Sequence, residues 1–128
     1  MSVEVVLSAD IGGTNTRLSL YEVNTSGNFA QIELNKVDEL PAKMIFQKKY
    51  ANDGHDSLLE VIRLFLKESG TNLYPTTACL AVAGPVSNNS AQLTNRSRWD
   101  INGKDLGEAL NLKRIRVIND FVAAGYGL

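Results

Sequence analysis

Residues 10–17 read Asp-Ile-Gly-Gly-Thr-Asn-Thr-Arg and combine residue types that can hold a phosphate group. Two adjacent glycines permit a tight turn and let backbone N–H groups approach an anion closely. Thr14 and Asn15 add side-chain donors. Asp10 can hold Mg²⁺ through oxygen, and Arg17 can offset phosphate charge. A plain hairpin turn would explain the Gly-Gly pair but not its polar neighbours, so we predict a phosphate site here.

A second candidate is the pair Asn119-Asp120, which follows a predicted strand at residues 115–118. Open α/β sheets place ligand groups at the carboxyl ends of their strands. A carboxylate there can accept the proton of a hydroxyl during phosphoryl transfer, and Asn119 can both donate to and accept from hydroxyl groups. An Asp at a helix start is also a common N-cap. Spacing alone does not decide between these two roles for Asp120.

The third candidate begins at Gly84-Pro85, a rigid turn after an apolar strand, and continues through Asn95 to Trp99. Amide and indole side chains suit a polyhydroxyl ligand, through hydrogen bonds and ring stacking. A loop followed by a core tryptophan explains the same residues. For Trp99 we favour the core, and we keep Asn95 as a candidate ligand contact.

The hydrophobic pattern predicts the elements that must position these residues. Alternation predicts strands at residues 3–8, 16–23 and 29–34, with a weaker candidate at 44–50. Helical spacing predicts a helix over 58–66, capped by Asp53 or Asp56 and stopped at Gly70. Further elements are predicted at 76–83 and 91–94 (strands), 103–110 (a helix capped by Asn102), 115–118 (a strand) and from 121 onward (a helix). An antiparallel start followed by strand–helix alternation indicates an α/β fold with a mixed sheet.

Composition narrows the class of protein. The 128 residues allow one domain, and 13 basic against 14 acidic residues give a net charge of -1. This balance argues against a nucleic-acid or anionic-membrane surface. The single cysteine, Cys79, lies in an apolar run and is expected to be buried and inert. His55 is expected to be solvated. The N-terminus lacks a signal-peptide pattern and no apolar run could span a bilayer, so we expect a cytoplasmic location without membrane contact.

The motif at residues 10–17 resembles the first phosphate motif of the sugar kinases in the actin and Hsp70 ATPase superfamily. Its glycine spacing differs from the Walker loop and from the dinucleotide fingerprint. The order Gly-Pro, Thr-Asn and Trp, followed by Asn119-Asp120-Phe121, resembles the bacterial-type glucokinases in particular. The resemblance implies a ribonuclease H-like (actin-like ATPase) lobe, with a mixed five-stranded sheet and flanking helices.

The resemblance also implies a role for each matching residue. It makes Asp120 the general base, and it assigns substrate binding to Asn95, Asn119 and Asp120. The segment implied to bind ATP comprises Ala9, Asp10, Ile11, Gly12, Gly13, Thr14, Asn15 and Arg17. Asp10 would position Mg²⁺. The implied activity is phosphorylation of glucose at its 6-hydroxyl by ATP, the entry step of glycolysis.

The same resemblance makes residues 1–128 the N-terminal small lobe of a two-lobe kinase. The last predicted helix stops at Leu128 without a stop signal, so we expect a truncated chain that is inactive by itself. Its exposed inter-lobe surface leaves a homodimer open. Two alternatives remain: a kinase for another hexose or an amino sugar, and a non-catalytic sugar-sensing relative. The retained Asp120 argues against the second.

Overall fold

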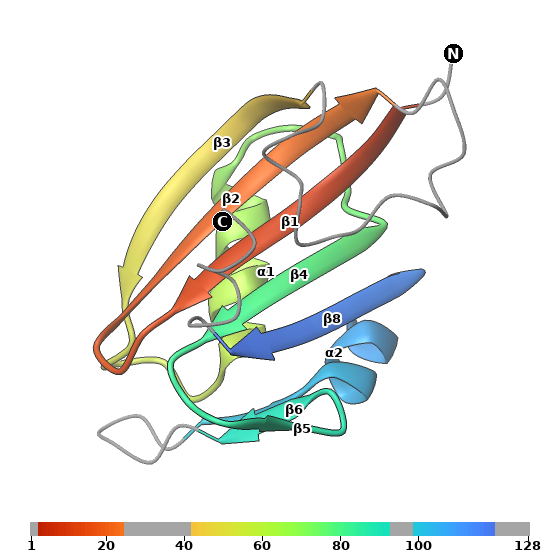
Figure 1. Ribbon diagram of the computed structural model, residues 1–128. Coiled ribbons are helices and arrows are strands. Elements are labelled where there is room, and N and C mark those ends of the chain that lie inside the picture. The colour runs from red at the N-terminus through yellow and green to blue at the C-terminus, as the bar shows by residue number, and fades with distance from the viewer. Residues whose placement is uncertain (1–2, 25–41, 93–98, 120–128) are drawn as a thin grey trace.

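The computed structural model describes residues 3–24, 42–92 and 99–119. These residues form a five-stranded sheet in the order β3-β2-β1-β4-β8 (Figure 1). β1 pairs antiparallel with β2, and β2 with β3, whereas β4 is parallel to both β1 and β8. The predicted mixed sheet is therefore confirmed. The strands are β1 (Val3–Ile11), β2 (Asn15–Asn24), β3 (Ala42–Ala51), β4 (Thr77–Val82) and β8 (Arg114–Asn119).

Two helices and a small antiparallel sheet complete the described fold. Helix α1 (Leu58–Glu68) connects β3 to β4 and lies behind the large sheet in Figure 1. Helix α2 (Gly103–Ala109) precedes β8 and lies beside it. The small sheet has the order β5-β6-β7, formed by β5 (Val86–Ser87), β6 (Ser90–Gln92) and β7 (Asp100–Asn102). Asn102 caps α2 as predicted, since its Oδ1 accepts from the Asp105 backbone N–H at 3.0 Å.

Some predicted elements need correction. The weaker candidate at 44–50 is the third strand of the sheet, β3, whereas the predicted strand at 29–34 and the helix from 121 lie outside the described residues. The N-cap of α1 is Ser57, so the choice between Asp53 and Asp56 was wrong. Ser57 Oγ accepts from the Glu60 backbone N–H at 3.2 Å, and Glu60 Oε2 accepts from the Asp56 backbone N–H at 2.9 Å. This reciprocal pattern resembles a capping box, which favours a serine three residues before a glutamate.

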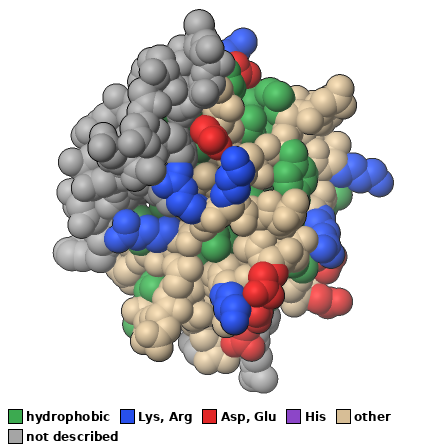
Figure 2. Space-filling view, turned by 90° about the vertical axis from the view of Figure 1, so that its right-hand side faces the viewer, with side chains coloured by type: hydrophobic (Ala, Val, Ile, Leu, Met, Phe, Trp, Pro, Cys, Tyr) green, Lys and Arg blue, Asp and Glu red, His purple; other side chains and the backbone are tan. Residues whose placement is uncertain are grey.

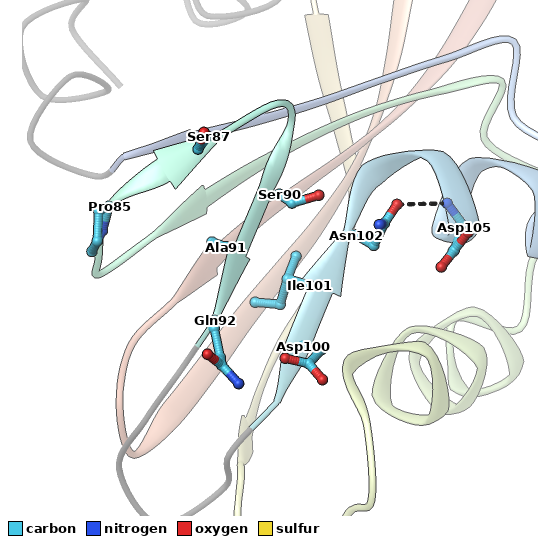
Figure 3. Close-up of a pocket in the computed structure, with 9 residues that line it drawn as sticks. All are labelled: Pro85, Ser87, Ser90, Ala91, Gln92, Asp100, Ile101, Asn102 and Asp105. Atoms are coloured by element: carbon cyan, nitrogen blue, oxygen red, sulfur yellow. Dashed lines mark hydrogen bonds between the residues drawn. The ribbon is translucent and has the colours of Figure 1, made fainter.

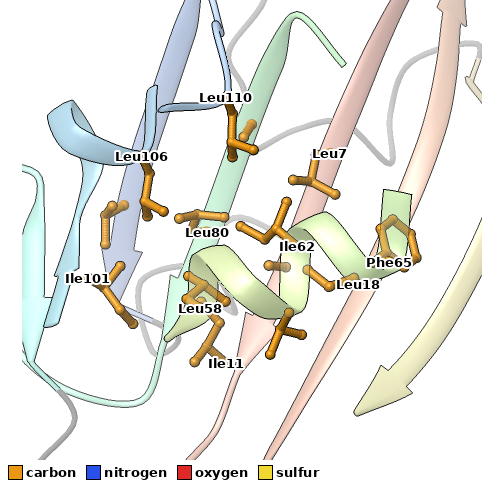
Figure 4. Close-up of a cluster of buried hydrophobic side chains, with 14 of the residues drawn as sticks. Leu7, Ile11, Leu18, Leu58, Ile62, Phe65, Leu80, Ile101, Leu106 and Leu110 are labelled. Carbon is orange, nitrogen blue, oxygen red and sulfur yellow. The ribbon is translucent and has the colours of Figure 1, made fainter. Parts of the chain in front are cut away.

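The main core lies between α1 and one face of the large sheet (Figure 4). Helical spacing brings Leu58, Ile62 and Phe65 onto the buried side of α1. Strand alternation presents the facing side chains, which include Leu7, Ile11, Leu18, Leu20 and Leu80. Because consecutive residues of a strand point to opposite faces, Asp10 and Arg17 project from the other face. The core thus determines which polar residues of β1 and β2 are available to a ligand.

Asn89 joins the small sheet to the edge of β8. Asn88 and Asn89 form the corner of the β5–β6 hairpin with φ values of 53° and 57°, as in a type I′ turn. Asn89 Nδ2 donates to the Ile115 carbonyl at 3.1 Å, and Asn89 Oδ1 accepts from the Val117 N–H at 2.6 Å. The side-chain amide therefore pairs with β8 as a neighbouring strand would.

Replacing Asn89 with alanine is expected to lower the free energy of unfolding by roughly 2 kcal/mol, because it leaves two strand groups without these partners. Asn88→Ala is the matched control, since it removes the same amide at a similar φ, whereas the bonds to Ile115 and Val117 of β8 come from Asn89. Denaturant unfolding of both variants measures the difference. Equal losses would show that turn strain, and not the contact with β8, explains the effect.

Glu68 ties the end of α1 to β3. Its carboxylate accepts from Tyr50 Oη at 2.5 Å and from Lys48 Nζ at 2.9 Å. The hydrogen bond from Tyr50, and then that from Lys48, lower the pKa of Glu68 below its ordinary value of 4.5. The charged carboxylate is therefore more favourable in the folded state than in the unfolded chain.

Because the pKa of Glu68 is lowered in the folded state, its contribution to the free energy of unfolding decreases as the pH falls. The contribution of Glu68 is complete above its unfolded pKa and is lost as the pH falls through the lower, folded pKa. We expect Glu68→Gln to be less stable than the wild type at neutral pH, with the difference disappearing in acid. Thermal unfolding of both proteins across this range provides the measurement. A difference that does not change with pH would contradict this account.

Candidate functional site

The three parallel strands β1, β4 and β8 end at the same edge of the large sheet (Figure 1). Ile11 is in register with Val82, which is in register with Asn119. Two further contacts join the segments that follow: the Ala83 N–H donates to the Ile11 carbonyl at 3.0 Å, and Asn119 Nδ2 donates to the Gly84 carbonyl. The fold thus brings together three segments that the sequence presents far apart.

The first of these segments is the turn at residues 12–15, which joins β1 to β2. The Gly12 N–H donates to the Asn15 carbonyl at 2.9 Å and closes the turn. Asn52, just beyond β3, adds two bonds, because its Nδ2 donates to the Gly12 carbonyl and its backbone N–H to the Thr14 carbonyl, both at 2.8 Å. Sequence reasoning missed Asn52, whose partner carbonyl on Gly12 lies 40 residues away along the chain.

An open depression of about 240 Å³ lies beside this turn. Its lining consists of Asp10, Gly12, Asn15, Arg17 and Lys49. The three charged members form one row across the strands, since Arg17 is in register with Asp10 on one side and with Lys49 on the other. The structure therefore places four of the predicted ATP-site residues on one depression, together with Lys49, which was not predicted. Alternation within β3 shows which residues share a face, but only the register between strands brings Lys49 beside Arg17.

The remaining residues of the predicted ATP segment differ in exposure. Ala9 and Ile11 are buried in the core under α1, so their side chains cannot contact a ligand at this edge. Thr14 is exposed at the corner of the turn. Gly12 and Gly13 are half-buried in the turn, so the predicted segment divides into the turn with its depression and two core residues that anchor the strand.

Asp10 is the residue for which a metal role is predicted. It is exposed on the depression, and no cluster of three or more His, Cys, Asp or Glu side chains occurs among residues 3–24, 42–92 and 99–119. Mg²⁺ that arrives with a nucleotide commonly takes one or two protein carboxylates and completes its shell with phosphate oxygens and water. A single exposed carboxylate beside a glycine turn fits that mode and does not fit a cage formed by protein side chains alone.

The second and third candidates are described only in part. Asn119 is partly exposed at the end of β8, whereas Asp120 and Asn95 lie outside the described residues. Trp99 is 1% exposed and its indole N–H donates to the His55 carbonyl at 3.2 Å, which confirms its predicted core position. The expectation of a solvated His55 is confirmed only in part, because that side chain is 21% exposed and its Nδ1 lies 3.2 Å from Glu60 Oε1. The Trp99 bond holds the backbone carbonyl of the same residue.

A larger hollow of about 770 Å³ lies over the small sheet (Figure 3). Two carboxylates, Asp100 and Asp105, are on its lining, and the Asp105 backbone N–H is engaged by Asn102. Pro85 belongs to the third candidate motif, but none of the lining residues is a predicted ligand contact. The full lining is Pro85, Ser87, Ser90, Ala91, Gln92, Asp100, Ile101, Asn102 and Asp105.

Other surface and core features are ordinary for a compact α/β unit. In Figure 2, basic and acidic side chains are interspersed with hydrophobic ones on the face shown. The helices within the described ranges are all too short or too polar to cross a bilayer. Cys79 is buried, as predicted, and burial raises the pKa of its thiol to about 11, which disfavours the reactive thiolate.

Comparison with known proteins identifies a consistent set of relatives. The sequence model of the glucokinase family matches residues 7–128. The glucokinase of Trichormus variabilis is 36% identical over 124 residues, which are 97% of this chain and 32% of that protein. The glucokinase of Chromohalobacter salexigens is 35% identical over 122 residues, covering 95% and 33% of the two chains.

Solved structures agree on the fold. The crystal structure of a glucokinase from an Antarctic psychrotroph has a TM-score of 0.71 and 29% identity, over 92% of this chain and 33% of that one. A ROK family glucokinase from Streptomyces griseus, solved with glucose and AMPPNP, has a TM-score of 0.57 and 15% identity, over 98% and 36% of the two chains. The actin-like ATPase fold of these sugar kinases confirms the predicted fold class. The chain spans about a third of the length of the curated relatives it matches.

Proposed function

Because the chain belongs to the glucokinase family, we propose that the complete protein transfers the γ-phosphoryl group of ATP to the 6-hydroxyl of glucose. Residues 1–128 would be its N-terminal lobe. The observation that carries this proposal is the convergence of the glycine turn, the Gly84-Pro85 segment and Asn119 at the carboxyl edge of β1, β4 and β8. Open α/β sheets bind their ligands at that edge.

The turn at residues 12–15 would receive the phosphates of ATP. Its glycines permit a close backbone approach, and Arg17 and Lys49 lie on the adjoining depression, where they offset negative charge. Asp10 would hold the Mg²⁺ of Mg-ATP, an ion that neutralises part of the phosphate charge when bound. Ala9 and Ile11 would contribute through the rigidity of β1, which is paired with β2 on one side and β4 on the other.

Glucose would be held between Asn119 and Asn95, with the carboxylate of Asp120 facing the 6-hydroxyl. Asp120 would accept the hydroxyl proton as the bond from the sugar oxygen to the γ-phosphorus forms and the bond to the leaving ADP oxygen breaks. The bond from Asn119 Nδ2 to the Gly84 carbonyl orients this end of β8. Most of the rate enhancement would come from positioning and charge stabilisation, aided by lobe closure that excludes water.

A panel of sugars tests the substrate. ADP release by the complete protein should have its highest kcat/KM with glucose. A higher kcat/KM with another hexose or with an amino sugar would identify a related kinase. Calorimetric binding of a sugar without any turnover would favour the sensing relative.

A cytoplasmic location and a homodimer complete the proposal. The first rests on the proposed use of ATP, and the second concerns residues 1–128 alone, whose inter-lobe surface would lack its partner lobe. Cell fractionation of the complete protein and size-exclusion chromatography of residues 1–128 test them. Recovery in an exported fraction, or elution as a monomer, would contradict the respective inference.

A further inference from the structure

We infer that Asn52 is a positioning residue that presents the turn at residues 12–15 to the phosphates of the nucleotide. This inference rests on the proposed function. Asn52 follows β3 directly, is 1% exposed, and takes no part in the chemistry described above. Three of its four hydrogen bonds are directed at one short segment of the chain, the turn and the first residues of β2.

Four hydrogen bonds define the position of Asn52. Its side-chain Nδ2 donates to the Gly12 carbonyl, and its backbone N–H donates to the Thr14 carbonyl, both at 2.8 Å. Its Oδ1 accepts from Thr16 Oγ1, also at 2.8 Å, and Thr16 is itself fully buried. The backbone carbonyl of Asn52 accepts from the His55 N–H at 3.3 Å, which adds a bond on the side of the following residues. The amide is therefore satisfied at both ends and has one orientation.

These bonds set the direction of peptide groups in the turn. The Gly12–Gly13 peptide is trans, so its carbonyl and its N–H point in opposite directions. With the Gly12 carbonyl held by Asn52, the Gly13 N–H must point away from Asn52. A glycine turn has little steric preference of its own, because glycine occupies both halves of the φ range. Asn52 thus fixes an orientation of the Gly12–Gly13 peptide group that the conformational preferences of the two glycines do not impose.

The orientation of these peptide groups determines whether the turn presents partial positive or partial negative charge to an anion. An engaged carbonyl keeps its partial negative charge directed at Asn52, whereas a released carbonyl could rotate towards an anion and repel it. Preorganised N–H groups act on a charged ligand without a reorganisation cost at the moment of binding. Loss of Asn52 should therefore weaken the binding of nucleotide phosphates more than the binding of sugar.

The test uses the complete protein with Asn52→Ala and Thr16→Val. We expect Asn52→Ala to weaken calorimetric binding of AMPPNP with Mg²⁺ about tenfold and to raise the KM for ATP to the same extent, with the KM for glucose unchanged. Thr16→Val keeps the shape of the side chain but removes the donor to Asn52 Oδ1, so a smaller loss in the same direction is expected. Thr16→Ser restores the hydroxyl and should restore nucleotide affinity.

Tyr50→Phe is the matched control. It removes a hydrogen bond from the same end of β3, but its partner is Glu68 on α1 and not the turn. We expect a lower Tm and wild-type affinity for AMPPNP. If Asn52→Ala lowers the Tm but leaves AMPPNP binding and the KM for ATP unchanged, Asn52 is structural only and the inference is wrong.

Two further outcomes separate this inference from the proposed function. If the wild-type protein phosphorylates no sugar but binds AMPPNP, the proposed function fails while the binding measurements still decide the role of Asn52. If the wild-type protein binds no nucleotide, both fail together. Should Asn52→Ala not fold, Thr16→Val and Thr16→Ser decide the question, and equal AMPPNP affinity for these two variants would overturn the inference.

Discussion

Replacing Asp120 with asparagine in the complete protein is expected to lower kcat for glucose phosphorylation by roughly 10²–10⁴-fold, the usual contribution of a general base. Asparagine has nearly the same shape but cannot accept the proton of the 6-hydroxyl. Nucleotide binding should persist, because the phosphate turn and Asp10 lie on β1 and its connection to β2. Steady-state kinetics and calorimetric binding of AMPPNP together measure the two effects.

Asp100→Asn serves as the matched control for this experiment. It makes the same chemical change at an exposed carboxylate of the small sheet, where we assign no catalytic role. Its kcat should equal that of the wild type. A near-normal kcat for Asp120→Asn would remove Asp120 from the mechanism. A large loss of nucleotide affinity in that variant would indicate a role in holding the nucleotide and not in proton transfer.

Trp99→Ala is expected to lower the free energy of unfolding by about 3–5 kcal/mol, the range for truncating a large buried aromatic residue. Trp99 is one of the largest fully buried side chains of the described structure and belongs to the main core. Its removal would leave a cavity and would also leave the His55 carbonyl without its indole donor. Denaturant unfolding measures the loss.

Trp99→Phe separates packing from the indole hydrogen bond. It keeps an aromatic ring in the core but removes the N–H, so we expect a smaller loss of about 1–2 kcal/mol. Both substitutions should leave the KM for glucose unchanged in protein that remains folded, since the ring is buried. A selective rise in the KM for glucose with little loss of stability would instead support ring stacking on the sugar.

Local patterns were enough to predict the elements that bury one face. The helix over 58–66 was predicted because its apolar residues recur at helical spacing, and that stripe is the side of α1 that packs on the sheet. β3 was the weaker candidate, since it forms an edge of the described sheet and carries Lys48 and Lys49 beside its apolar residues. Charged residues are common on edge strands, where they oppose pairing with other chains. Its pattern is correspondingly less clear.

The residues of the candidate site were likewise predictable only where they are close in sequence. Asp10, Gly12, Asn15 and Arg17 are close in sequence, so their residue types alone indicated a phosphate site. Asn52 and Lys49 come from a distant segment, and only the pairing of β2 with β3 brings them to the turn. Strand register depends on the whole sheet, and the residue types at positions 49 and 52 do not indicate it. Contacts of this kind require the folded structure.

The most direct test of the proposed function is the formation of glucose 6-phosphate from glucose and Mg-ATP, with residues 1–128 and the complete protein assayed side by side. We predict that the complete protein forms one glucose 6-phosphate for each ADP released and that residues 1–128 alone form none. Absence of the product from the complete protein would contradict the assignment of a glucose kinase. Turnover by residues 1–128 alone would contradict the division of the site between two lobes.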